Sequence, residues 1–128
     1  RRCLIVASGF YEWKKLDKEK KPIYIFLKNR KSFNFAGLFD KWVSPEGEEL
    51  YSCTILTTDA NELIQDVHNR MPVIVNENDE NRWLDVSVPV EDVMSILAPY
   101  PSEGMEFYNV STYVNSPKNQ GPDCIEPL

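Results

Sequence analysis

Histidine and cysteine are scarce in this sequence. His68 is the only histidine, and the three cysteines, Cys3, Cys53 and Cys124, are widely spaced and form no Cys-x-x-Cys pair. This set argues against a zinc site and favours a reducing compartment. Cys3 and Cys53 stand in apolar runs, so we expect both to be core residues. We expect no metal ion and no cofactor.

Long apolar runs are also missing. No segment approaches the ~20 residues of a membrane-spanning helix, and no signal-peptide pattern opens the chain. We therefore expect no membrane association and a cytoplasmic location, at the nucleoid if the source is a bacterium. The sequence does not begin with methionine, so we expect the natural N-terminus to lie upstream of Arg1.

The net charge of −6 is unevenly distributed. Residues 1–31 carry ten Lys or Arg and three Asp or Glu, whereas residues 32–128 carry four and seventeen. An acidic protein repels nucleic acid as a whole, yet a basic segment beside an acidic body can still bind a phosphate backbone locally. The plainer interpretation of Lys14 to Lys21 is a solvated hairpin loop, and we prefer it for that loop.

Short apolar segments separated by turn residues dominate the first half of the chain. We expect strands over residues 3–7, 10–13, 22–28, 33–42 and 50–57. Strands at this spacing indicate an antiparallel meander that curls towards a barrel or sandwich.

The second half mixes short helices with strands. Helices are expected over residues 60–66, 77–85 and 90–97, with Thr58 or Asp59 capping the first, and strands over residues 73–75 and 106–111. From Val114 on, turn formers predict a tail laid over the body. The 128 residues, 42% of them hydrophobic, suit one domain. The expected fold class is α+β, a mainly antiparallel β pseudo-barrel with two or three short helices.

The first candidate functional residue is Glu12, in the stretch Ser8-Gly9-Phe10-Tyr11-Glu12-Trp13. Aromatic neighbours remove water from a carboxylate, which disfavours the charged form. Proteins make general acids and bases in this way. The alternative is an alternating strand with Phe10 and Glu12 on one face, Tyr11 and Trp13 on the other, and Glu12 pointing at water. Spacing alone favours this alternative.

The second candidate stretch is His68-Asn69-Arg70-Met71-Pro72, between a predicted helix and a short predicted strand. Side chains at such connections can project into a cleft. Histidine exchanges protons near neutral pH, and the planar guanidinium of Arg70 suits a phosphate. A lone histidine in a loop is more often structural than catalytic, so His68 is a weak candidate when taken alone.

Together these stretches resemble the SRAP family, the SOS response-associated peptidases. The resemblance rests on Arg2-Cys3-Leu4-Ile5 leading to Gly9-Phe10-Tyr11-Glu12-Trp13, and then on Thr57-Thr58, His68 to Ile74 and Trp83-Leu84 in the same order. It covers nearly the whole chain. Val6 is a departure, because the family usually has proline after the Arg-Cys-Leu-Ile run.

The resemblance implies binding to single-stranded DNA that carries an abasic site, in the DNA-damage (SOS) response. The ring-opened sugar of such a site is an aldehyde. In the family, the amine of an N-terminal cysteine forms a Schiff base with it. The thiol then closes a thiazolidine ring, which leaves a covalent DNA–protein crosslink. By resemblance, Glu12 manages the proton of the amine, and His68 moves protons to and from the sugar oxygen.

The resemblance also implies a set of DNA-binding residues and a monomeric protein. Trp13 would stack beside the lesion, and Thr57 and Arg70 would hold backbone phosphates. Met71 belongs to the same implied set.

The nucleophile of the family has no counterpart in this chain, and neither does an upstream asparagine–arginine motif. Cys3 matches a core-strand cysteine of the family and has no free amine, because Arg1 and Arg2 precede it. Residues 1–128 are therefore identified as a SRAP-like domain that lacks the N-terminal segment with the catalytic cysteine. The family also has an inferred autopeptidase activity. Two alternatives stay open: a non-catalytic single-stranded nucleic-acid-binding module, and a peptidase acting on another protein.

Overall fold

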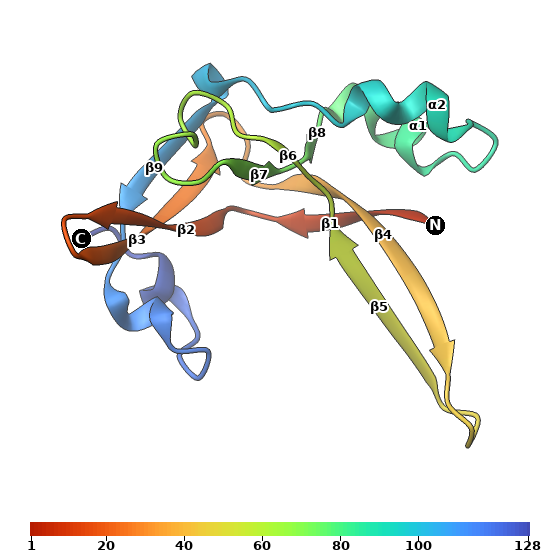
Figure 1. The fold of residues 1–128 in the computed structure, drawn as a ribbon, viewed down its shortest axis with the longest axis horizontal. Helices are drawn as coiled ribbons and strands as arrows, with labels where there is room; N and C mark the ends of the chain where they lie inside the picture. Colours follow the sequence, from red (N-terminus) through yellow and green to blue (C-terminus); the bar gives the residue numbers. More distant parts are fainter.

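The computed structural model describes residues 1–128 and contains three antiparallel sheets (Figure 1). The first sheet has β1 (Arg2–Ala7), β4 (Phe33–Val43) and β5 (Glu49–Ile55), with β8 (Ile74–Val75) paired to β4. The second has the order β2 (Phe10–Leu16), β3 (Glu19–Leu27) and β9 (Met105–Asn109). The third pairs β6 (Thr57–Asp59) with β7 (Arg70–Pro72).

The predicted α+β class with mainly antiparallel strands is confirmed. All five strands expected in the first half form. The hairpin loop expected from Lys14 to Lys21 is wrong in extent, because β2 and β3 stay paired through these charged residues and only Asp17 and Lys18 form the turn. No backbone ladder joins the first sheet to the second, so these residues do not close a barrel by themselves.

Helices occupy two of the three predicted segments and are short. The first consists of η1 (Glu77–Asp79) and α1 (Glu80–Leu84), and the second of α2 (Val90–Val93) and η2 (Met94–Ile96). Three further 3-10 turns are η3 (Ser102–Gly104), η4 (Thr112–Asn115) and η5 (Pro122–Ile125). None of these helices has the length and hydropathy that crossing a membrane requires.

The helix predicted over residues 60–66 is wrong, because this segment forms turns. The Asn61 side chain accepts a hydrogen bond from the Ile64 N–H over 3.0 Å, and the Gln65 N–H reaches the Asn61 carbonyl over 2.9 Å. The chain must reverse here so that β7 can pair with β6, with Asp59 opposite Arg70. Tertiary pairing therefore overrides a weak local helix preference.

Two apolar clusters form the core. The larger cluster fills the space between the second sheet, β4 and the loop from β6 to β7, and its buried members are Ile23, Ile25, Leu27, Phe33, Phe35, Ile64, Met71, Ile74 and Met105. The smaller cluster joins the helices to the first sheet and contains Ala36, Val73, Val75, Trp83, Val93 and Ile96. The larger cluster thus lies directly beneath the loop that carries His68.

Trp83 joins the helical segment to β1. Its indole N–H donates to the Cys3 carbonyl over 2.8 Å. The Arg2 guanidinium lies 5.5 Å from the indole centroid and donates to the carbonyls of Trp83, Asp85 and Val88 over 2.5, 2.6 and 2.9 Å. These bonds satisfy carbonyls at the helix end, and the cation over the ring adds a cation–π attraction.

The outer halves of β4 and β5 extend away from the body as a two-stranded ribbon (Figure 1). Trp42, Leu50 and Tyr51 on this ribbon are 59%, 59% and 62% exposed. Cys53 lies on the same ribbon and is exposed, so the prediction that it is a core residue is wrong, while Cys3 is half-buried. The sequence marks both strands as apolar, but no second layer of this chain packs on the ribbon.

The tail predicted from Val114 on lies over the second sheet, as expected. The Tyr11 hydroxyl donates to the Cys124 carbonyl over 3.0 Å, and the Tyr108 hydroxyl donates to the Ile125 carbonyl over 2.5 Å. Burial raises the pKa of both phenols, so each keeps its proton and remains a donor. Two strands of one sheet thus hold the tail through tyrosine side chains.

Gly9 is expected to tolerate no side chain. A Cβ at this position would lie 2.5 Å from the Tyr24 hydroxyl oxygen and 2.6 Å from the Ile25 carbonyl oxygen. Because a paired backbone carbonyl cannot move aside, Gly9→Ala should lower the free energy of unfolding by about 3 kcal/mol, measured by urea denaturation. Gly47→Ala is the control: Gly47 has open space around it but φ +87°, so the cost should stay near 1 kcal/mol. If the two variants lost the same free energy of unfolding, the close contacts with Tyr24 and Ile25 would not be the cause of the Gly9→Ala effect.

Candidate functional site

Glu12 lies in β2 on the packed side of the second sheet. It is directly opposite Ile23 of β3, and its neighbour Phe10 is opposite Ile25. Cross-strand partners share a face, and both isoleucines are fully buried in the larger core cluster. Glu12 itself is half-buried. The strand alternation predicted for this stretch is confirmed, but the Glu12 face is the one that packs against the core.

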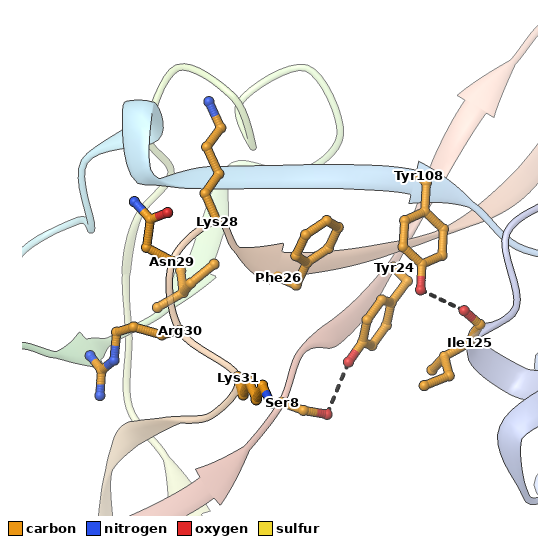
Figure 2. Close-up of a pocket in the computed structure, with 10 residues that line it drawn as sticks. Ser8, Tyr24, Phe26, Lys28, Asn29, Arg30, Lys31, Tyr108 and Ile125 are labelled. Carbon is orange, nitrogen blue, oxygen red and sulfur yellow. Dashed lines mark hydrogen bonds between the residues drawn. The ribbon is translucent and has the colours of Figure 1, made fainter.

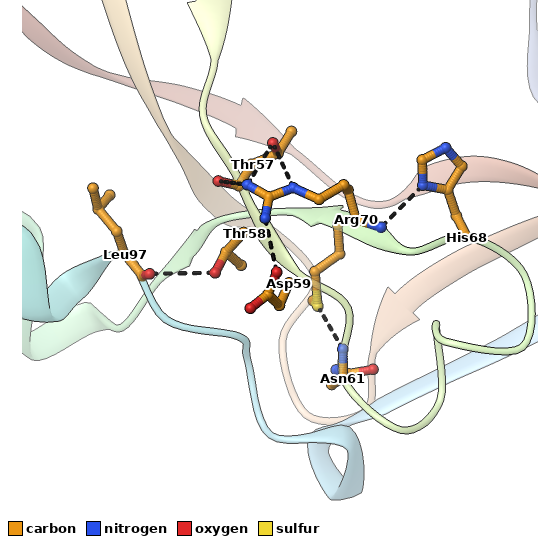
Figure 3. Close-up of polar contacts among 8 residues, drawn as sticks. Thr57, Thr58, Asp59, Asn61, His68, Arg70 and Leu97 are labelled. Atoms are coloured by element: carbon orange, nitrogen blue, oxygen red, sulfur yellow. Dashed lines mark hydrogen bonds and ion pairs between the residues drawn. The ribbon is translucent and has the colours of Figure 1, made fainter.

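His68 ends the loop between β6 and β7 and is exposed. The backbone N–H of Arg70 donates a hydrogen bond to His68 Nδ1 over 3.0 Å (Figure 3). A ring nitrogen that accepts a hydrogen bond carries no proton, so this bond selects the neutral tautomer with its proton on Nε2. His68 therefore presents an N–H donor at Nε2, away from Arg70.

Glu12 and the loop that carries His68 lie on the same side of the second sheet, although they are far apart in the sequence. The loop that carries His68 packs on the larger core cluster through Ile64, and Ile23, the cross-strand partner of Glu12, belongs to that cluster. None of the five main cavities is lined by Glu12 or His68. A shared cleft for the two side chains stays a prediction.

Trp13 lies on the opposite face from Glu12, because successive residues of a strand point to opposite faces. Its indole N–H donates to Asn115 Oδ1 over 2.7 Å, its ring lies 6.5 Å from that of Tyr11, and it is 37% exposed. Trp13 and Glu12 therefore do not face one pocket from the same side of β2. β2 is an outer strand of its sheet, so only an extended ligand that crosses its free edge contacts both residues.

The Arg70 guanidinium is engaged by two residues of β6 (Figure 3). Its NH1 atom is 2.9 Å from Asp59 Oδ1, and its NH2 atom donates to the Thr57 carbonyl over 2.9 Å. Thr57 Oγ1 lies 3.2 Å from NH2 and 3.4 Å from Nε. The structure thus brings together Arg70 and Thr57, both predicted DNA-binding residues, and adds Asp59. Sequence reasoning missed Asp59, whose only signal was its acidic side chain beside Thr57-Thr58.

Met71 was predicted to bind DNA, but the structure places its side chain in the core. Its side chain is 1% exposed and belongs to the larger core cluster. Its sulfur accepts a hydrogen bond from the Asn61 N–H over 3.3 Å. Because strand residues alternate, Arg70 is exposed while Met71 points inward. A side chain so buried cannot touch DNA, so Met71 supports the strand that carries Arg70 instead.

Cys3 has the properties of a structural thiol. Burial, and secondarily the nearby Cys53 thiol, raise the pKa of Cys3. A protonated thiol is a poor nucleophile. This agrees with the expectation that Cys3 is not the nucleophile of the site.

A groove of about 570 Å³ lies on the Trp13 side of the second sheet (Figure 2). Its floor is formed by the rings of Tyr24, Phe26 and Tyr108, whose centroids lie 5.5 to 6.1 Å apart. The loop of residues 28–31 borders it. No predicted site residue lines this groove, so it is separate from the Glu12 face.

Comparison with known proteins identifies the family. The family model for SOS response associated peptidase (SRAP) matches residues 1–117. The chain is 52% identical over 128 residues to abasic site processing protein YoqW of Bacillus subtilis (strain 168), covering 98% of this chain and 57% of that protein. It is 35% identical over 149 aligned positions to abasic site processing protein HMCES of Gallus gallus, covering 100% of this chain and 44% of that protein.

The fold comparison agrees with the sequence comparison. A crystal structure of a protein from Bacteroides thetaiotaomicron matches with a TM-score of 0.91 at 30% identity, over 99% of this chain and 56% of that chain. The chain thus spans about half the length of the curated relatives it matches. With the family model matching residues 1–117, this chain belongs to the SRAP family.

Proposed function

We propose that this chain is the part of a SRAP protein that binds single-stranded DNA at abasic sites. Where a mature N-terminal cysteine is present, the protein captures the site covalently. The observation that carries the proposal is that Glu12 and the loop that carries His68 lie on the same packed side of the second sheet, with the Arg70 backbone N–H bonded to His68. The names of YoqW and HMCES, both abasic site processing proteins, support the substrate.

In this proposal Glu12 transfers protons from the amine of the cysteine. The neutral amine attacks the aldehyde carbon, and the Glu12 carboxylate carries the excess proton from the nitrogen to the carbonyl oxygen, which becomes a hydroxyl. The second proton of the nitrogen, carried in the same way, lets that hydroxyl leave as water and gives the Schiff base. The thiol then adds to the same carbon, and its proton passes to the nitrogen. Water is the only product released, and no oxidant is needed. Glu12 is half-buried on the packed face of β2, a place where a carboxylate can act as a general base towards an amine held beside it.

In this proposal His68 donates a hydrogen bond to the ring oxygen of the sugar. When the closed sugar opens, the bond between the anomeric carbon and the ring oxygen breaks, and that oxygen develops negative charge. The Nε2–H that the Arg70 N–H selects on His68 can donate to this oxygen. The Arg70 backbone thus positions His68 as a hydrogen-bond donor.

Single-stranded DNA fits the placement of these residues better than a duplex. Contacts with Glu12 on one face and Trp13 on the other require a ligand that turns around the free edge of β2. A duplex is stiff over about 150 base pairs, whereas an unpaired strand bends freely and exposes bases that can stack on Trp13. In this proposal the protein binds DNA as a monomer. It acts in the DNA-damage response, in the compartment that holds the cell's DNA.

Arg70→Ala is expected to weaken binding to single-stranded DNA by about three- to tenfold at low salt. The plot of log affinity against log salt concentration should become shallower by about 0.7, the value of one phosphate contact on a single strand. Fluorescence anisotropy across a salt series measures both. Arg82→Ala is the matched control, because Arg82 is exposed on α1 and contacts only Ser95 Oγ. If both variants behave alike, Arg70 makes no phosphate contact.

Binding without covalent chemistry is the second candidate function for residues 1–128 taken alone. The observation that favours it is Cys3, which is half-buried, has a raised pKa and follows Arg1 and Arg2. Intact mass after incubation with abasic single-stranded DNA distinguishes the two candidates. The protein mass alone indicates binding only, whereas protein plus DNA indicates a nucleophile within these residues.

A further inference from the structure

We infer that Asp59 is a built-in competitor for the phosphate that Arg70 binds. Asp59 would then set how tightly, and with what salt dependence, this site holds nucleic acid. The ligand is one phosphate group of an unpaired strand, so the inference rests on the proposed function. It adds a residue that acts on affinity through Arg70 and does not itself contact DNA.

Two kinds of acceptor hold the Arg70 guanidinium (Figure 3). Thr57 supplies neutral oxygens, the carbonyl 2.9 Å from NH2 and Oγ1 within 3.4 Å of Nε. Asp59 supplies a charged oxygen 2.9 Å from NH1. Neutral acceptors fix the plane of the guanidinium and leave its charge intact, whereas a carboxylate cancels that charge. The guanidinium is therefore oriented by Thr57 and neutralised by Asp59.

Asp59 occupies the part of the guanidinium that a phosphate would use. Carboxylates and phosphates both bind arginine through charge-assisted hydrogen bonds, so they compete for the same N–H groups. The Asp59 side chain is 90% exposed and that of Arg70 is 45% exposed. An ion pair this open to water is weak and rearranges easily. A phosphate can thus displace Asp59, but repulsion from the carboxylate lowers the affinity of the complex.

The pairing follows from the register of the β6–β7 ladder. Asp59 lies directly opposite Arg70, and Thr57 lies two residues away on the same face of β6. Each strand is three residues long, and the buried Met71, opposite Thr58, sets which face of the ladder points inward. Both β6 residues therefore meet Arg70 because of backbone pairing.

The test is Asp59→Asn, which keeps the size of the side chain and an acceptor oxygen but removes the charge. The probe is a fluorescein-labelled oligothymidine, with affinity measured by anisotropy across a salt series. We expect a three- to tenfold gain in affinity at about 50 mM salt that shrinks as salt rises, because salt screens the repulsion that the substitution removes; the salt slope is therefore steeper than in the wild type. In an Arg70→Ala background, the same substitution should change neither quantity by more than the control does.

Asp66→Asn is the matched control, because Asp66 is an exposed acid in the loop between β6 and β7 and forms no ion pair. Equal gains from the two variants, or a gain that persists with Arg70→Ala, would indicate general charge repulsion and overturn the inference. Weaker binding by Asp59→Asn would mean that Asp59 holds Arg70 in place, which also overturns it. Wild-type protein that binds no oligothymidine would instead reject the proposed function. Thermal melts confirm that each variant is folded.

Discussion

Replacing Glu12 with glutamine is expected to slow the capture of abasic sites by about a hundredfold or more in a SRAP chain that presents an N-terminal cysteine. Glutamine keeps the size of the side chain and its place on β2 but cannot take up the proton of the attacking amine. Affinity for the same DNA should change little, because one half-buried carboxylate contributes little to phosphate binding. His68→Ala should slow capture by a similar factor, because alanine has no donor for the sugar oxygen.

The measurement is the single-turnover rate of formation of an adduct that survives denaturant, with affinity determined separately. Glu106→Gln is the matched control, because Glu106 is exposed on β9 opposite Phe26, on the other face of the second sheet from Glu12. An unchanged rate for Glu12→Gln would remove Glu12 from the chemistry and leave the packed face of the sheet without a catalytic part. A loss of both rate and affinity would assign it a binding role.

Replacing Trp83 with alanine should cause the largest loss of stability among the single substitutions considered. Trp83 is 2% exposed in the smaller core cluster and donates to the Cys3 carbonyl. Truncating a buried tryptophan leaves a cavity, and here it also leaves a carbonyl unpaired and removes the ring beneath Arg2. We expect the free energy of unfolding to fall by about 4 kcal/mol.

Trp42→Ala makes the same chemical change on the β4–β5 ribbon, where the side chain is 59% exposed. Its cost should be about 1 kcal/mol or less, since little apolar area returns to water. Urea denaturation of both variants gives the two values. It is followed by circular dichroism, because the substitutions remove tryptophans and so change the fluorescence. A cost for Trp42 as large as that for Trp83 would mean that the ribbon is packed in solution, contrary to its exposure here.

The strands were predictable because their signals are local. An apolar run such as Pro22 to Lys28, flanked by turn residues, favours an extended chain whatever surrounds it, and the alternation of Phe10 to Trp13 fixes which side chains share a face. Two of the three predicted helices formed as well, and each has one buried anchor, Trp83 in α1 and Val93 in α2. The candidate residues Glu12, His68, Thr57 and Arg70 came from a resemblance carried by these same local stretches.

The errors arose where the outcome depends on what packs nearby. Residues 60–66 have enough helix formers to predict a helix, yet they turn so that Asp59 can pair with Arg70. Cys53 stands in an apolar run, yet its strand lacks a covering layer and it is exposed. Met71 follows Arg70 in the motif but faces the core.

Local sequence is enough to say where the chain extends, where most of its turns lie and which residues carry ionisable groups. Three features required contacts between distant segments: that the packed face of β2 is the face of Glu12, that the Trp13 indole bonds to Asn115, and that Asp59 meets the Arg70 guanidinium. The difference lies in how far apart in the sequence the interacting residues are. Local patterns fix backbone conformation over a few residues, whereas sheet register and burial are set by contacts between segments that the sequence keeps far apart.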